Sequence, residues 1–137
     1  MKQIRLFIFC IGLGIMASCG VTKPASLTDI SNTTWELDHI TGMTKEQLPQ
    51  PATLSFEDGK VSGFLGCNNF SGNMNLDDQS VLFSELKGTM KACSVGSVTE
   101  NHLLNAMTNA TSMNIVKGML QLRKGKEILA QFKKSTK

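Results

Sequence analysis

The middle of the chain contains a strong β-hairpin signal. Apolar and polar residues alternate over 52–57, which is typical of a strand with one buried face. Asp58-Gly59 follows directly and suits a type I′ turn, in which both central residues need a positive φ. Residues 60–67 then form the returning strand. Because a two-residue turn can join only antiparallel strands, this segment predicts an antiparallel sheet.

Further short strands are predicted on both sides of this hairpin. Their patterns fall at residues 35–37, 72–76, 81–86, 115–116, 119–122 and 128–132. Gly63 and Gly66 lie within the returning strand, and glycines there indicate a bend or bulge. A loop with two prolines is expected over 41–51. The sheet is therefore expected to curve.

One helix is predicted over 98–111. Ser97 and Glu100 have the spacing of a capping box, in which the two residues cap each other's backbone. Apolar residues follow at helical spacing: Leu103, Leu104, Met107 and Ala110. This face is expected to pack in the core, with a ligand groove as the alternative. The predicted fold is α+β: a curved, mainly antiparallel sheet, or partial barrel, with one helix packed on it.

The first eighteen residues have the features of an export signal. Lys2 and Arg5 precede an apolar run over 6–17, which is short of the about 20 residues that a membrane span needs. The run ends in Met16-Ala17-Ser18-Cys19, which resembles the bacterial lipobox. That resemblance implies cleavage before Cys19 and lipid attachment to its thiol. An ordinary secretory signal followed by an unrelated cysteine is the alternative.

The leader implies a cellular location and a domain organisation. We expect a signal peptide at 1–18, a lipidated tether at 19–30 and a domain at 31–135. No acidic residue occurs between Cys19 and Asp29, so by analogy with lipoprotein sorting we expect an outer-membrane protein whose domain faces the periplasm. The chain has 14 basic and 11 acidic residues, and removal of the leader takes away two of the basic ones, Lys2 and Arg5. The remaining near-neutral domain gives no argument for nucleic-acid binding.

Several motifs occur in an order that resembles a known family. They are Trp35-x-Leu37, the segment 54–59, Gly63-x-x-Gly66-Cys67-Asn68, Gly72, the segment 89–93 and Leu120-x-Leu122. Together they resemble the META domain, the family of the heat-shock lipoprotein HslJ, over about residues 31–132. The resemblance implies a mostly antiparallel β-domain with one helix in exported bacterial proteins. The family is linked to stress and antibiotic tolerance, and it has no established catalytic mechanism.

Cys67 and Cys93 are the cysteines that remain after removal of the leader and lipidation of Cys19. Two thiols in an exported domain pair readily in the oxidising periplasm, so a structural disulfide is the leading expectation. In the chain-entropy model such a bond contributes roughly 3 kcal/mol. Zinc binding, a redox role and two free thiols are the alternatives. A zinc site would need further cysteine or histidine ligands at suitable spacing, and the sequence has none. A redox role would favour a C-x-x-C pair, which is absent.

No catalytic, metal or cofactor site is predicted. His39 and His102 have no sequence neighbours that would form a triad or a metal site. Asn68 and Asn69 could complete a tight turn or line a binding surface. We therefore expect a non-enzymatic envelope lipoprotein that binds an envelope protein or a small apolar ligand, or supports the envelope under stress. A cell-wall enzyme or enzyme inhibitor, and a piloting protein for another outer-membrane component, are the alternatives.

Overall fold

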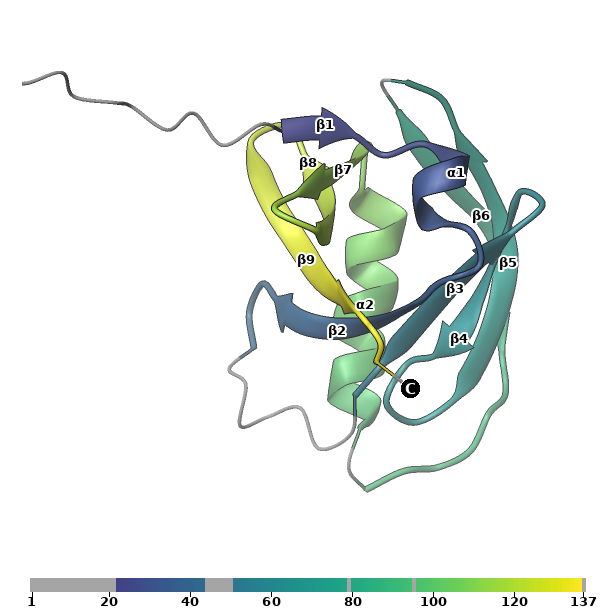
Figure 1. Cartoon of the computed structure of the whole chain (residues 1–137). Coiled ribbons are helices and arrows are strands. Elements are labelled where there is room, and N and C mark those ends of the chain that lie inside the picture. The colour runs from purple at the N-terminus through teal and green to yellow at the C-terminus, as the bar shows by residue number, and fades with distance from the viewer. Residues whose placement is uncertain (1–21, 44–50, 79, 95, 137) are drawn as a thin grey trace, which may run out of the picture.

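The computed structural model of the protein describes residues 22–43, 51–78, 80–94 and 96–136 (Figure 1). Along these ranges the elements follow in the order β1 (Thr22–Pro24), α1 (Leu27–Ile30), β2 (Thr34–Ile40), β3 (Thr53–Glu57), β4 (Lys60–Phe64), β5 (Asn69–Leu76), β6 (Val81–Gly88), α2 (Ser97–Asn109), β7 (Ser112–Val116), β8 (Met119–Lys124) and β9 (Glu127–Lys134). Within them, no helix is long and apolar enough to cross a membrane. The leader with Cys19, and residues 44–50 of the expected loop, lie outside the described ranges.

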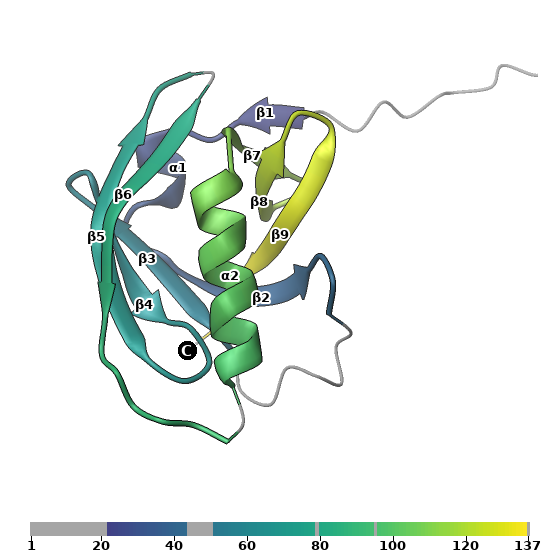
Figure 2. The same ribbon diagram turned by 180° about the vertical axis from the view of Figure 1, so that it is seen from behind.

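All described strands form one antiparallel sheet. Its order is β1-β7-β8-β9-β2-β3-β4-β5-β6, so the early strand β2 lies beside the late strand β9. The sheet curves around α2 without closing (Figures 1 and 2). On the open side, the backbone N–H of Val81 donates to the carbonyl oxygen of Thr111 at 3.2 Å. The predicted α+β fold, a curved sheet with a helix packed on it, is confirmed.

The core lies between α2 and the concave face of the sheet. Leu103, Met107 and Ala110 are buried, as the helical spacing predicted, whereas Leu104 is half-buried. Ala106 of α2 is also buried, which that spacing did not predict. The largest fully buried side chains of the strands are Trp35, Phe56, Phe132, Ile40, Leu54, Leu120, Leu122 and Val61. Burial of each such side chain stabilises the fold by about 1.5–3 kcal/mol relative to exposure. The helix face therefore serves packing rather than a ligand groove.

The central hairpin has the predicted turn. Asp58 and Gly59 both have positive φ, at 47° and 73°, as a type I′ turn requires. At Gly63 a Cβ would overlap the carbonyl oxygen of Thr53, so the close approach of β3 and β4 requires glycine there. β4 pairs with β3 and β5 without a register shift, so no bulge interrupts it, and it ends at Phe64, which places Gly66 beyond the strand rather than within it.

The predicted capping box at the start of α2 is wrong. Gly96, with φ at 100°, occupies the N-cap, and Ser97 is the first helical residue. No side chain caps this end by a hydrogen bond. The carboxylate of Glu100 accepts instead from Asn68, which lies far away in sequence. The helix also ends at Asn109 rather than near residue 111.

The expected domain boundary near residue 31 is also wrong. β1 pairs with β7, and the N–H of Ala25 donates to the carbonyl oxygen of Met113 at 2.9 Å. Ala25 and Ile30 are buried, and the indole N–H of Trp35 donates to Ile30 at 3.2 Å. Only two apolar side chains anchor this segment, so it has no periodicity that a sequence pattern could reveal. Residues 22–30 belong to the folded domain, not to a tether.

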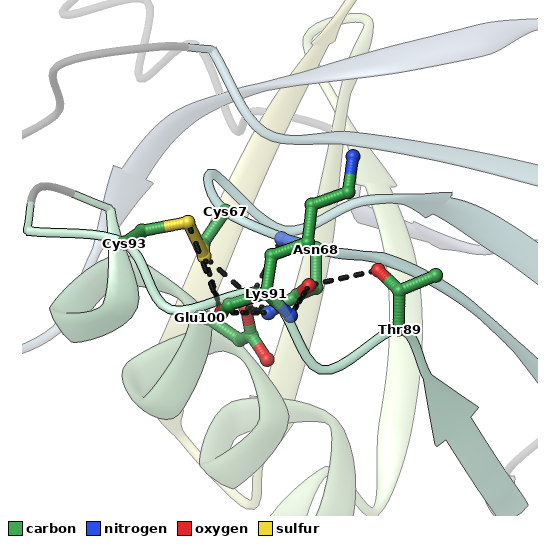
Figure 3. The surroundings of a disulfide bond; sticks show 6 residues. All are labelled: Cys67, Asn68, Thr89, Lys91, Cys93 and Glu100. Carbon is green, nitrogen blue, oxygen red and sulfur yellow. Dashed lines mark hydrogen bonds between the residues drawn. A yellow bond between two sulfur atoms is a disulfide. The ribbon is translucent and has the colours of Figure 1, made fainter.

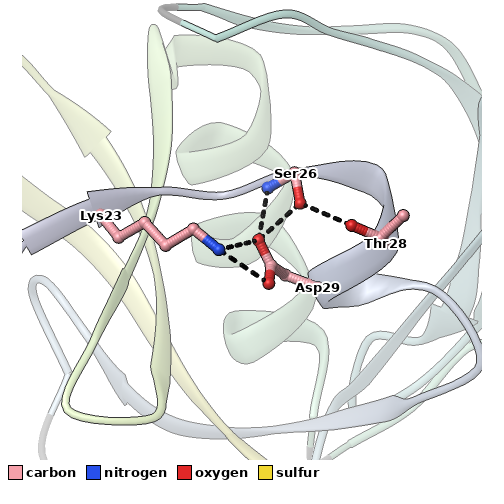
Figure 4. Close-up of polar contacts among 4 residues, drawn as sticks. All are labelled: Lys23, Ser26, Thr28 and Asp29. Carbon is pink, nitrogen blue, oxygen red and sulfur yellow. Dashed lines mark hydrogen bonds and ion pairs between the residues drawn. The ribbon is translucent and has the colours of Figure 1, made fainter.

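A short polar cluster fixes the turn between β1 and α1 (Figure 4). The backbone N–H and the hydroxyl of Ser26 both donate to the carboxylate of Asp29, at 3.1 and 2.5 Å. The ammonium of Lys23 lies 3.0 Å from the same carboxylate. The Ser26 hydroxyl, followed by Lys23, lowers the pKa of Asp29 from 3.8 to about 2. The charged form of Asp29 therefore stabilises the docked segment.

Replacing Asp29 by asparagine is expected to loosen the docking of α1 at neutral pH and to remove the dependence of that docking on acidic pH. Because the pKa is lowered by folding, the stabilisation is complete above pH 3.8 and is lost as the pH falls through about 2. The indole N–H resonance of Trp35 reports docking of α1, since it donates to Ile30. In the native protein that resonance should change over this acidic range, whereas D29N should show the change already at pH 7. If the Trp35 resonance of D29N depended on pH as it does in the native protein, the role of Asp29 would be contradicted. D78N is the control, because Asp78 is an exposed aspartate in a turn and its replacement should leave that pH dependence unchanged.

Candidate functional site

Cys67 and Cys93 join two loops at one end of the sheet (Figure 3). Cys67 follows β4, and Cys93 lies in the segment between β6 and α2. The structure joins them in a disulfide with a Cα–Cα distance of 6.0 Å. The predicted pairing is therefore present. A paired sulfur is neither a nucleophile nor a thiolate ligand, so neither cysteine offers those chemistries in this state.

The two disulfide-bonded loops, residues 66–68 and 89–93, are called the disulfide corner below. Asn68 links this corner to its surroundings with both the oxygen and the nitrogen of its side-chain amide. Its Oδ1 accepts from the Thr89 hydroxyl and from the Lys91 backbone N–H, both at 2.8 Å. Its Nδ2 donates to the Glu100 carboxylate at 3.0 Å and to the Lys91 carbonyl at 3.4 Å. The Asn68 backbone N–H donates to the same carboxylate oxygen at 3.1 Å. One side chain thus fastens the β4–β5 corner, the segment 89–93 and α2 together.

Two glycines let the start of α2 approach this corner. Gly66 and Gly96 have φ values of 99° and 100°. A Cβ on Gly96 would overlap the Gly66 carbonyl oxygen, and one on Gly66 would lie 3.2 Å from the Cβ of Thr99. The close contact brings Glu100, in the first turn of α2, within reach of Asn68. The sequence pattern did not identify Gly96, although a glycine directly before a predicted helix was a usable signal.

Asn68 and Asn69, expected to lie together on a turn or a binding surface, have different surroundings. Asn68 is 5% exposed, and its amide is used in internal hydrogen bonds. Asn69 is exposed at the start of β5, and its carbonyl accepts from the Thr89 N–H at 3.0 Å. The amide of Asn68 therefore serves to hold these segments together, and its part in a binding surface stays a prediction. Asn69 stays a candidate.

The outer surface of the corner is shallow and chemically mixed. A cavity of about 340 Å³ lies over the disulfide, and Met90, Lys91 and Asn101 line it. Met90 is 99% exposed. Glu100 is the carboxylate here, and its hydrogen bonds with Asn68 already occupy one of its oxygens. This arrangement suits contact with another molecule better than acid–base chemistry.

The histidines do not join this site. His39 is exposed on β2, and His102 lies on α2 at a different cavity, with Asn105 and Lys124. Among the residues that the structure describes, no group of three histidine, cysteine or acidic side chains could hold a metal ion.

Replacing Asn68 by alanine is expected to lower the free energy of unfolding by about 2 kcal/mol, because the segment 89–91 and Glu100 lose buried partners. Water can reach part of this site, which limits the cost. Urea unfolding measures the effect. The matched control is Asn69→Ala, which removes an exposed amide and should shift stability by less than about 0.5 kcal/mol. Equal losses in the two variants would contradict the fastening role of Asn68.

Comparisons with known proteins agree with the fold. The sequence model of one family, described as the META domain, matches residues 26–136. This range includes α1, in agreement with the boundary that the structure shows. No curated protein gave a significant match.

Solved structures share the architecture. The chain resembles the NMR structure of a protein from Burkholderia xenovorans, with a TM-score of 0.64 and 26% identity, over 79% of this chain and 85% of that one. It also resembles the crystal structure of a DUF4847 family protein from Bacteroides vulgatus, with a TM-score of 0.59 and 17% identity, over 81% of this chain and 98% of that one. The second likeness concerns the fold alone.

Proposed function

The chain belongs to the META domain family, and on that premise we propose that it is a lipid-anchored envelope protein whose domain is a non-catalytic binding module. One observation carries this proposal: the Cys67–Cys93 disulfide, built into the corner that Asn68 fastens. Structural disulfides persist in oxidising compartments outside the cytoplasm and are rare within it. The export signal and the lipobox-like Met16-Ala17-Ser18-Cys19 agree with a location outside the cytoplasm.

The position of β1 adds an orientation to the proposal. β1 begins at Thr22, three residues after Cys19, and it is paired with β7. Three residues span at most about 11 Å. A lipid on Cys19 would therefore hold the β1 end of the domain close to the membrane. The loop between β6 and α2, which carries Cys93, lies at the opposite end of the molecule from β1 (Figures 1 and 2).

This orientation would present the disulfide corner to the periplasm. Met90 in that loop is 99% exposed, and methionine is enriched in protein–protein interfaces relative to the rest of the surface. A partner protein of the envelope is the occupant that fits best. Support of the envelope under stress would then act through that partner.

The test of the anchor and the redox state is the intact mass of the protein extracted from bacterial membranes. Loss of residues 1–18, a lipid addition on Cys19, and alkylation of Cys67 and Cys93 only after reduction are the expected results. Cys19→Ala should leave the protein unlipidated and release it from the membrane fraction. An unlipidated native chain, or thiols that alkylate without reduction, would contradict the proposal.

The test of the binding surface is site-specific photo-crosslinking in cells. A crosslinker at position 90 should give one discrete protein adduct, whereas the same group at position 82 should not. Leu82 is the matched control because it is also strongly exposed, at 61%, but lies on β6. Equal crosslinking at both positions, or none at 90, would exclude the corner as the interface.

A further inference from the structure

We propose that the cavity between α2 and the β8–β9 hairpin binds a small zwitterion, of the size of an amino acid or a dipeptide. The cavity measures about 290 Å³, just below the about 300 Å³ at which sites for drug-sized ligands begin, so only a very small ligand fits. Its location separates it from the disulfide corner, since the two cavities share no lining residue. The inference does not depend on the lipid anchor and goes beyond the proposed partner contact.

Two opposite charges line this cavity without forming a direct ion pair. Lys124 and Glu127 are directly opposed at the last pair of the β8–β9 ladder, so their side chains lie on the same face. Both contribute to the cavity. In the described ranges the ion pairs within 4.0 Å are Lys23–Asp29 and Lys133–Glu36, so the ammonium of Lys124 and the carboxylate of Glu127 remain available.

The helix supplies the facing wall. His102, Asn105 and Asn109 are spaced by three and four residues and therefore share one face of α2. The Asn109 amide donates to the backbone and side-chain oxygens of Asn105, at 2.9 and 2.5 Å, and this pairing orients the two amides.

The histidine ring and two apolar side chains complete the site. A Cβ on Gly42 would lie 3.0 Å from Cε1 of His102, so glycine there, with φ at 87°, lets the ring pack against the chain after β2. Ala106 is buried and Leu129 is half-buried, and both line the cavity. The other lining residues are polar or charged, which suits a polar ligand.

The charges define the ligand. A carboxylate would accept from the Lys124 ammonium, and an ammonium would donate to the Glu127 carboxylate. Amide groups between them would meet the asparagines of α2. A ligand with a single charge would pair with either Lys124 or Glu127 and leave the other side chain without a partner. The site should therefore prefer a zwitterion over a singly charged analogue.

The experiment is an NMR titration of the isotope-labelled full chain in detergent micelles. Glycylglycine is the zwitterionic probe, and N-acetylglycine and glycinamide each carry one of its two charges. We expect saturable shifts concentrated at Asn105, Lys124 and Glu127. Because charge pairing at exposed side chains is worth little in water, each singly charged probe should bind about two- to fivefold more weakly.

Variants separate the two ends of the site. Lys124→Met should abolish the preference for glycylglycine over glycinamide, and Glu127→Gln should abolish its preference over N-acetylglycine. Lys126→Met is the matched control, because Lys126 is exposed in the same turn but does not line the cavity. Equal binding of all three probes, shifts outside the cavity, or no saturable shift would overturn the proposal. If a hairpin variant disturbs the spectrum of the free protein, Asn105→Ala provides an independent test, and unchanged binding by it would also count against the site.

Discussion

Reduction of the Cys67–Cys93 disulfide is expected to lower the free energy of unfolding by about 3 kcal/mol. The bond joins residues 26 positions apart, so it restricts a long segment of the unfolded chain. In the native state the same segment stays fastened by Asn68, which bonds to Thr89 and Lys91. The reduced protein should therefore keep its fold and lose stability chiefly through its freer unfolded state.

Urea unfolding with and without reductant measures this loss. The control is the double variant Cys67→Ala/Cys93→Ala, whose stability should match that of the reduced protein and should not respond to reductant. An unchanged unfolding midpoint on reduction would mean that the bond contributes nothing to stability. The stability loss of Asn68→Ala should also differ between oxidised and reduced protein, because the bond and the amide hold the same segment and their effects are not independent.

Local sequence patterns predicted the elements whose signals are themselves local. The Asp58-Gly59 turn needs only two residues with positive φ, and the helical spacing of Leu103 and Met107 depends only on α2 itself. β1 lacks such a signal. It has three exposed residues and exists because β7, more than eighty residues later, provides its backbone partners. A strand of this kind is determined by tertiary pairing and leaves no periodicity.

The capping box failed for a related reason. Ser97 and Glu100 have the correct spacing, but a carboxylate bonds to whichever donors lie nearest in the fold. The Asn68 amide and backbone N–H meet Glu100 because Gly66 and Gly96 bring the corner against the helix. That approach joins segments far apart in sequence, so no local rule describes it.

The candidate site was predictable in part. Pairing of Cys67 with Cys93 followed from the expected compartment and from the absence of other partners. The two asparagines were indistinguishable as residue types, although neighbours along extended chain point to opposite sides. Which of them faces inward depends on where the segment 89–93 packs. The disulfide fixes that position, and residue type alone could not indicate it.

The contact between Gly66 and Gly96 leads to the largest expected effect of a single substitution. Gly96→Ala should lower the free energy of unfolding by about 4 kcal/mol. Two causes combine. A non-glycine residue at φ of 100° costs about 1–2 kcal/mol, and the new Cβ would overlap the Gly66 carbonyl oxygen. Backbone on both sides of the contact must then shift, which adds about 1–3 kcal/mol, as in other overpacked sites. The shift would also separate Glu100 from Asn68.

Gly118→Ala separates these causes. Gly118 also has a positive φ, at 78°, but a Cβ there meets no atom within 4 Å. It should therefore show only the backbone cost, about 1–2 kcal/mol. Urea unfolding of the two variants gives the difference, and the amide resonance of Asn68, which donates to Glu100, reports whether the corner has opened. A large loss in Gly96→Ala with a displaced Asn68 resonance is the expected result. Equal losses in both variants would show that the backbone conformation, rather than the close packing of α2 on the corner, accounts for glycine at position 96.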